Sequence, residues 1–136
     1  MGDLRVTRMT NRDPAFYPTL GPFLARREVH RAVGATPWDD DGKEWFVAAL
    51  GGRVVGFAGV LVEGDKATFC SDYVVGGEAE RGVRDALMRE RVKWAGGRAK
   101  VAAAVVSRLD RKTYEKAGFV AGRETVNYTV MRKELA

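Results

Sequence analysis

The apolar positions of this sequence fall into short runs, some alternating with polar residues and some continuous, and turn residues separate the runs. Short runs that are rich in β-branched and aromatic residues predict strands. The predicted strands are residues 4–9, 44–50, 53–62, 67–75, 100–106, 119–125 and 127–133. The run VAAAVV at 101–106 is apolar throughout, which predicts a strand buried on both faces beside a parallel partner.

Apolar residues recur at helical spacing in three other stretches. The predicted helices are residues 16–33, 78–95 and 110–117. In the second of these, Val83, Leu87 and Trp94 share one face, and Glu80 lies in the first turn, where its charge complements the helix dipole. Residues 11–14 are expected to form a turn in which Asp13-Pro14 is a possible helix start. The first helix could form two pieces, because two prolines and a glycine interrupt it.

The order of these elements predicts the fold class. The three strands between residues 44 and 75 are separated by short turns, such as Gly51-Gly52, and are expected to form an antiparallel meander. The strand at 67–75, the helix at 78–95 and the strand at 100–106 form a βαβ unit with a right-handed crossover. The sequence therefore predicts one α/β (α+β) domain, residues 1–136, with a mixed sheet of about seven strands and flanking helices.

Composition and charge restrict the compartment and the partners. The chain has 136 residues, no apolar run of the roughly 20 residues that a membrane span needs, and no apolar signal-peptide core at its start. A single cysteine, Cys70, excludes an internal disulfide and predicts a reducing, cytoplasmic location. The net charge of +5 fits a solvated surface, an anionic ligand or nucleic acid.

The junction between the strand at 67–75 and the helix that follows predicts an anion-binding site. Gly76-Gly77 ends the strand, and the helical pattern begins directly afterwards. The first backbone N–H groups of a helix have no partner within the helix and point at one spot, which phosphates commonly occupy. We therefore expect a phosphorylated ligand at this junction.

Three motifs give the chain a resemblance to the GNAT superfamily of acyl-CoA-dependent N-acyltransferases. They are the hairpin GGRVVGFAGV at 51–60, the strand–loop–helix at 72–88, and TYEKAGF at 113–119 followed by a closing strand that ends MRKEL. The resemblance covers nearly the whole chain. It implies a GNAT-like fold and an N-acetyltransferase that moves the acetyl group of acetyl-CoA to a primary amine by direct attack, without a metal.

The resemblance also implies a site for acetyl-CoA. The implied contacts are Tyr73, Val74 and Val75 for the pantetheine arm, and Arg81, Gly82, Val83 and Arg84 for the pyrophosphate. The family's pyrophosphate motif falls on residues 79–84, where only Gly82 matches it. Ala79 and Arg84 depart from the motif, and Arg84 could either pair with the phosphates or block the site.

Residues after the strand at 100–106 could complete this site. Ser107 occupies a place where the family often has an asparagine, but it could instead cap the helix that starts near Asp110. Four cations could reach the 3′-phosphate of CoA or could form a solvated helix face: Arg108, Arg111, Lys112 and Lys116.

Two residues are the candidates for catalysis. Tyr114 matches the family's tyrosine that protonates the departing thiolate, although a tyrosine before the Gly118 turn could equally be packed with its hydroxyl satisfied. Asp72 is the candidate base that removes a proton from the amine, with Glu44 as the alternative, and either could act through water. Each could also be a surface or paired carboxylate, and a lone His30 gives no metal-binding pattern.

The acceptor amine has no signature in the sequence. The loop Trp38–Asp41, an aromatic residue beside three acids, could hold a cationic amine or could be a plain polar loop. A second subunit could complete the acceptor side, which would make the protein a homodimer. The alternative function is a catalytically inactive GNAT-fold protein, with cofactor binding lost at Ala79 and Arg84, that binds a protein or nucleic-acid partner.

Overall fold

The computed structural model describes residues 3–27, 29, 42–77, 80–108 and 110–135, with Arg81 by its backbone only. Within these ranges the strands are β1 (Leu4–Met9), β2 (Glu44–Leu50), β3 (Arg53–Glu63), β4 (Lys66–Val74), β5 (Val101–Ser107), β6 (Val120–Glu124) and β7 (Tyr128–Glu134). The helices are α1 (Phe16–Leu24), α3 (Glu80–Ala95) and α4 (Arg111–Lys116). The predicted strands all occur, and their boundaries differ from the expected ones by at most one residue.

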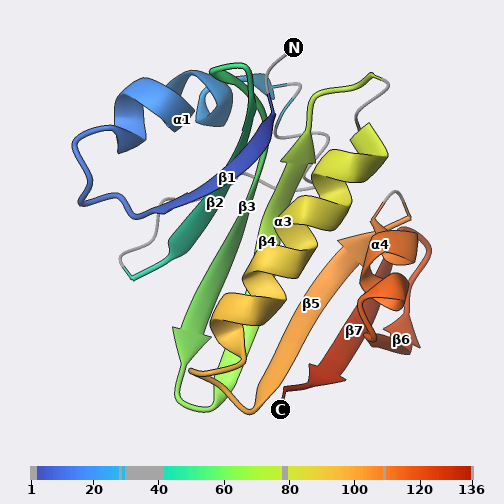
Figure 1. Ribbon diagram of the computed structural model, residues 1–136. Coiled ribbons are helices and arrows are strands. Elements are labelled where there is room, and N and C mark those ends of the chain that lie inside the picture. Colours follow the sequence, from blue (N-terminus) through green and yellow to red (C-terminus); the bar gives the residue numbers. More distant parts are fainter. Residues whose placement is uncertain (1–2, 28, 30–41, 78–79, 109, 136) are drawn as a thin grey trace.

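In the described part of the chain the strands form one seven-stranded sheet in the order β1-β2-β3-β4-β5-β7-β6. β4 and β5 run parallel, and every other neighbouring pair runs antiparallel. α3 is the crossover between the two parallel strands (Figure 1). The predicted mixed sheet with a central βαβ unit is therefore confirmed.

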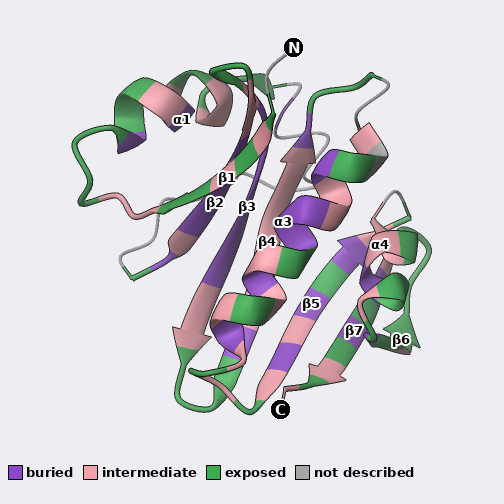
Figure 2. Cartoon of the chain, in the orientation of Figure 1, coloured by how far each residue is buried: buried purple, intermediate pink, exposed green. Residues whose placement is uncertain are grey.

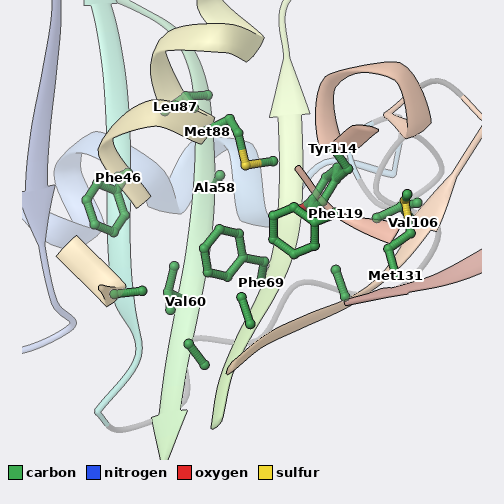
Figure 3. Close-up of a cluster of buried hydrophobic side chains, with 14 of the residues drawn as sticks. Phe46, Ala58, Val60, Phe69, Leu87, Met88, Val106, Tyr114, Phe119 and Met131 are labelled. Carbon is green, nitrogen blue, oxygen red and sulfur yellow. The ribbon is translucent and has the colours of Figure 1, made fainter. Parts of the chain in front are cut away.

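Helices cover the two faces of the sheet with different cores. α3 and α4 contribute Leu87, Met88 and Tyr114 to the larger core, which extends from β2 to β7 (Figure 3). α1 contributes Phe16 and Leu20 to a smaller core on the opposite face. Figure 2 shows the resulting pattern, with buried residues concentrated in β2, β3 and along one side of α3.

β4 contains an irregularity at its centre. Ser71 has a φ of 58°, in the left-handed region, and the register of β4 against β3 shifts at this point. Such a bulge adds one residue to a strand and redirects the side chains that follow it. As a result Phe69 and Val74, which are separated by an odd number of positions, both enter the core beneath α3.

The first helix differs in part from the prediction. It is interrupted after Leu24, and residues 27 and 29 are again helical, so the expected division into two pieces is present. α1 begins at Phe16, the first residue of the predicted helix, and the possible start at Asp13-Pro14 is not used, because the residue before α1 is Ala15. The carboxylate of Asp13 instead accepts the N–H of Thr10 at 2.7 Å and closes the preceding turn.

The lack of a side chain at Gly56 allows α3 to lie close to β3. A Cβ on Gly56 would lie 2.9 Å from both the carbonyl oxygen of Tyr73 and Cγ1 of Val83. Gly56→Ala is therefore expected to lower the free energy of unfolding by about 1–3 kcal/mol in urea denaturation, because the helix or strand must shift. Gly97→Ala, where an added Cβ has no neighbour within 4 Å, should change it by less than about 0.5 kcal/mol. Equal losses in the two variants would contradict this account.

Candidate active site between β4 and β5

β4 and β5 separate toward their carboxyl ends. Their ladder ends at the pair Phe69–Ala104, and beyond it the two strands diverge (Figure 1). At the end of β4 the N–H of Val75 donates to the carbonyl of Val55, on the β3 side, at 2.8 Å. Because backbone groups alternate in direction along a strand, those of Val74 face away from β3. Among the predicted pantetheine contacts, Val74 thus has the orientation to pair with a ligand beside β4.

The other two predicted contacts have different surroundings. The N–H of Val75 is already committed to β3, as described above. The ring of Tyr73 lies in the smaller core, with its centroid 5.5 Å from that of Phe57 and 6.3 Å from that of Phe23. A ligand could therefore not use the N–H of Val75, and it could contact Tyr73 only through atoms other than the packed ring.

The turn from β4 into α3 is open to a ligand. An added Cβ at Gly76 or Gly82 would have no neighbour within 4 Å. A cavity of about 500 Å³ adjoins this turn, and Val83 lines it. Arg26, two residues after the end of α1, and Arg53 of β3 line the same cavity, and neither was among the residues predicted from the sequence. The surroundings of the turn thus combine exposed glycine backbone with two cations.

Asp72, Arg91 and Tyr114 form a compact cluster that joins β4, α3 and α4. The Arg91 guanidinium donates to both oxygens of the Asp72 carboxylate, at 3.1 and 2.7 Å. The Tyr114 hydroxyl donates to Oδ2 of Asp72 at 2.9 Å and accepts from Arg91 at 3.2 Å. Arg91 and Tyr114 are each 1% exposed, whereas the side chain of Asp72 is 15% exposed.

Burial and charge set the protonation states in this cluster. Burial raises the pKa of Tyr114 well above its usual value, and the nearby Arg91 offsets this only in part. Burial alone would lower the pKa of Arg91, but the neighbouring Asp72 carboxylate and Tyr114 more than compensate and raise it. Tyr114 is therefore a neutral hydrogen-bond donor, and Arg91 is a permanent cation.

The structure brings together both predicted catalytic residues, but their contacts differ from the simplest expectation. The hydroxyl of Tyr114 is satisfied, as one of the two interpretations of the sequence expected, but by the side chains of Asp72 and Arg91. Both oxygens of the Asp72 carboxylate accept hydrogen bonds from Arg91, and the role of Asp72 as the base stays a prediction. The alternative base, Glu44, pairs with Arg8 at 3.9 Å and lies two strands from β4.

Sequence reasoning missed Arg91, although the sequence contained a signal for it. Arg91 follows Leu87 by four positions and Val83 by eight, so it lies on the apolar face of α3. A cation at such a position must either reach solvent or find a buried partner. Here it is buried with Asp72 as its partner.

Arg84 extends from α3 to the start of α4. Its guanidinium forms one ion pair with Glu80, at 2.9 Å, and another with Asp110. The hydroxyl of Ser107 donates to the other oxygen of Asp110 at 3.4 Å. The side chain of Asp110 makes no hydrogen bond that caps α4. Its carboxylate is instead bound by both Arg84 and Ser107.

Three of the four cations predicted near the 3′-phosphate have partners within the protein. Arg108 donates to the carbonyl of Val126, Arg111 pairs with Glu115 and Glu124, and Lys116 pairs with Asp85 at 3.0 Å. Lys112 is exposed and makes no ion pair or hydrogen bond within the part of the chain that the structure describes.

Several candidates lie outside the described residues. These are Ala79, the side chain of Arg81, His30 and the loop Trp38–Asp41. Among the residues with a described position, no group of three or more acidic, histidine or cysteine residues could hold a metal ion. No helix in this part of the chain is long and apolar enough to cross a membrane.

This mixed sheet, with one parallel pair joined by a crossover helix, agrees with the fold that the sequence resemblance implied. A family model described as the acetyltransferase (GNAT) family matches residues 8–119. The chain therefore belongs to the GNAT acetyltransferase family. No curated protein matched the sequence.

Solved structures support the same fold. An aminoglycoside 6′-acetyltransferase type Ii has a TM-score of 0.75 at 14% identity, with 97% of each chain covered. The ribosomal-protein-S18-alanine N-acetyltransferase of Escherichia coli has a TM-score of 0.71 at 17% identity, covering 98% of this chain and 95% of its own. The N-acetyltransferase PseH of Campylobacter jejuni, solved with acetyl coenzyme A, has a TM-score of 0.63 at 13% identity, covering 98% and 100%. At these identities the likeness concerns the fold.

Proposed function

We propose that this protein transfers the acetyl group of acetyl-CoA to a primary amine. Family membership and the neighbour solved with acetyl coenzyme A support acetyl-CoA as the cosubstrate. The observation that carries the proposal is the position of a neutral, buried tyrosine hydroxyl beside the point where β4 and β5 separate. This is where a thioester bound along Val74 would bring its sulfur toward a hydrogen-bond donor.

The residues around the separation fit such a cosubstrate. The backbone of Val74 could pair with the amides of the pantetheine arm. The open turn at Gly76 and Gly82 leaves room for the pyrophosphate, and Arg26 and Arg53 of the adjoining cavity supply positive charge. Lys112 has no partner in the described chain and is available for the 3′-phosphate.

In the proposed reaction the amine nitrogen attacks the thioester carbonyl carbon, the carbon–sulfur bond breaks, and the sulfur leaves as a thiolate that accepts a proton. Tyr114 supplies the hydrogen bond, and then the proton, to the sulfur. The nitrogen loses a proton as the amide forms, and this proton returns through water to the Tyr114 oxygen. The Tyr114 hydroxyl can turn from Asp72 toward the sulfur at modest cost, because Asp72 keeps both hydrogen bonds from Arg91. Asp72 and Arg91 are thus positioning residues that hold the Tyr114 hydroxyl in place through their hydrogen bonds.

The amine must lose a proton before it attacks, since its usual pKa lies above neutrality. With Asp72 paired to Arg91, we propose that solvent water accepts this proton. The rate is then expected to rise with pH until the acceptor amine is largely neutral.

The alternative of an inactive, partner-binding protein has no specific observation in its favour. It rests on loss of cofactor binding at Ala79 and Arg84. Ala79 lies outside the described residues, and Arg84 forms ion pairs with Glu80 and Asp110. The acceptor could be a small molecule, a protein amine or an amine on nucleic acid, and a panel of all three classes is the way to distinguish them.

The proposal is tested first by calorimetric titration of the folded protein with acetyl-CoA, with dephospho-CoA and adenosine as comparison ligands. We expect micromolar binding of acetyl-CoA and weaker binding of dephospho-CoA. Release of free CoA thiol is then measured with the amine panel. Absence of acetyl-CoA binding by a protein with native circular dichroism would contradict the proposed function.

A further inference from the structure

Arg84 bridges two elements that border the separation of β4 and β5. It lies in the second turn of α3, just after Gly82, and its side chain is 14% exposed. One partner, Glu80, belongs to the same helix, and the other, Asp110, immediately precedes α4. The side chain of Asp110 is 13% exposed. The bridge therefore stands at the edge of the proposed phosphate site, partly accessible from solvent.

The charges around this bridge do not balance. Glu80, Asp110 and Asp72 are three carboxylates, and Arg84 and Arg91 are the two guanidiniums that face them. With all five of these described groups ionised, one negative charge is left over. A pyrophosphate brings two further negative charges into the same region, so freeing a cation or taking up a proton would favour its binding.

We propose, building on the acetyl-CoA binding proposed above, that Arg84 exchanges Asp110 for the pyrophosphate when the cosubstrate binds, and that Asp110 then takes up a proton. The guanidinium can form two parallel hydrogen bonds to phosphate oxygens as readily as to a carboxylate. Asp110 is left between Asp72 and the bound phosphates, with the hydroxyl of Ser107 as its remaining hydrogen-bond donor.

The surroundings of Asp110 favour this proton uptake. Burial, together with the nearby Asp72, raises the pKa of Asp110 to about 7, although Arg84 and Arg91 of α3 and Ser107 of β5 act in the opposite direction. When Arg84 leaves Asp110 for the pyrophosphate, one of the groups that lower this pKa is gone, so the pKa of Asp110 rises further in the complex. Since the complex then binds more protons than the free protein, affinity for acetyl-CoA should fall as pH rises through about 7.

Proton uptake is measured by calorimetric titration with acetyl-CoA at one pH in two buffers that differ in ionisation enthalpy. At pH about 7.5 we expect roughly half a proton or more per acetyl-CoA, and less below pH about 6, where Asp110 is already protonated in the free protein. Asp110→Asn should abolish this part of the uptake. The same ligand is used with both proteins, so proton exchange by the phosphates of CoA itself cancels in the comparison.

Variants at the two ends of the bridge should have opposite effects. Arg84→Met should weaken acetyl-CoA binding by about 10-fold or more, because a charge-assisted contact to phosphate is lost. Asp110→Asn should leave binding unchanged or strengthen it at pH 8, because Arg84 is no longer held by a full charge. Asp85→Asn is the matched control, since it breaks another ion pair between α3 and α4 and should change the affinity by less than about twofold.

A merely structural bridge gives a different result. Arg84→Met and Asp110→Asn would then weaken binding alike, or neither would affect it, and wild type and Asp110→Asn would take up equal numbers of protons. Each of these results would overturn the exchange. If neither variant affected binding, Arg26 and Arg53 would remain as the phosphate contacts. If wild type bound no acetyl-CoA at all, the proposed function would fail instead, and the two failures are thereby distinguished.

Discussion

Arg91→Met is expected to lower the free energy of unfolding by about 3–5 kcal/mol, because it leaves the Asp72 carboxylate largely buried without its counter-ion. The guanidinium is 1% exposed and donates twice to Asp72, so neither water nor another described cation replaces it readily. Urea denaturation at neutral pH measures the loss. Methionine retains most of the packing volume, which separates the loss of charge from the creation of a cavity.

Two comparisons isolate the ion pair. Arg89→Met removes an exposed cation from the same helix and should cost less than about 0.5 kcal/mol. The double variant Asp72→Asn with Arg91→Met should be more stable than Arg91→Met alone, because no unpaired charge remains. If the double variant were as unstable as the sum of its two single changes, the Asp72–Arg91 pair would not be the source of the loss.

Tyr114→Phe is expected to lower kcat by about 100-fold or more, because the departing sulfur loses its proton donor. The change keeps the ring, which packs with Phe69 and Phe119 in the larger core, and leaves Asp72 its two hydrogen bonds from Arg91 (Figure 3). The Kd for acetyl-CoA should therefore change little. Initial rates of thiol release with a reactive amine, together with calorimetry, measure the two quantities separately.

Tyr17→Phe is the matched control, since Tyr17 is 56% exposed on α1 and the same hydroxyl is removed from a surface position. It should leave both kcat and Kd within about twofold of wild type. An unchanged kcat in Tyr114→Phe would exclude Tyr114 as the proton donor and would reduce its role to joining α4 to Asp72.

The fold could be predicted from the sequence because local signals agreed with one another. Gly51 and Gly52 both have positive φ, 60° and 83°, as their place in the predicted two-residue hairpin turn requires. The apolar run at 101–106 lies beside its parallel partner β4, as predicted. The predicted burial on both faces is wrong, because burial alternates along β5 and Val105 is 66% exposed. The possible helix start at Asp13-Pro14 is not realised, because an Asp side chain can close either a helix or a turn, and here Asp13 closes the turn at Thr10.

The site was harder to predict. The sequence, with the family resemblance, led to Tyr114 and Asp72, and their catalytic roles stay predictions. That these residues share Arg91 could not be predicted, because the contact depends on how α3, β4 and α4 meet rather than on any local pattern. For Arg84, the sequence left open whether it pairs with the phosphates or blocks the site. Its ion pair with Asp110 depends on how the start of α4 packs beside α3, which no local pattern in the sequence indicates.

The left-handed conformation of Ser71 has a consequence for both faces of the sheet. Such a conformation costs a non-glycine residue about 1–3 kcal/mol and persists only where its surroundings hold it. On the α1 side the buried ammonium of Lys43 donates to the Ser71 hydroxyl at 2.8 Å, and on the α3 side the next residue, Asp72, is tied to Arg91. Lys43 thus holds Ser71 from one face of the sheet, and Arg91 holds the next residue, Asp72, from the other face. We therefore expect a change that straightens β4 at Ser71, such as loss of the Lys43 contact, to reorient Asp72 as well.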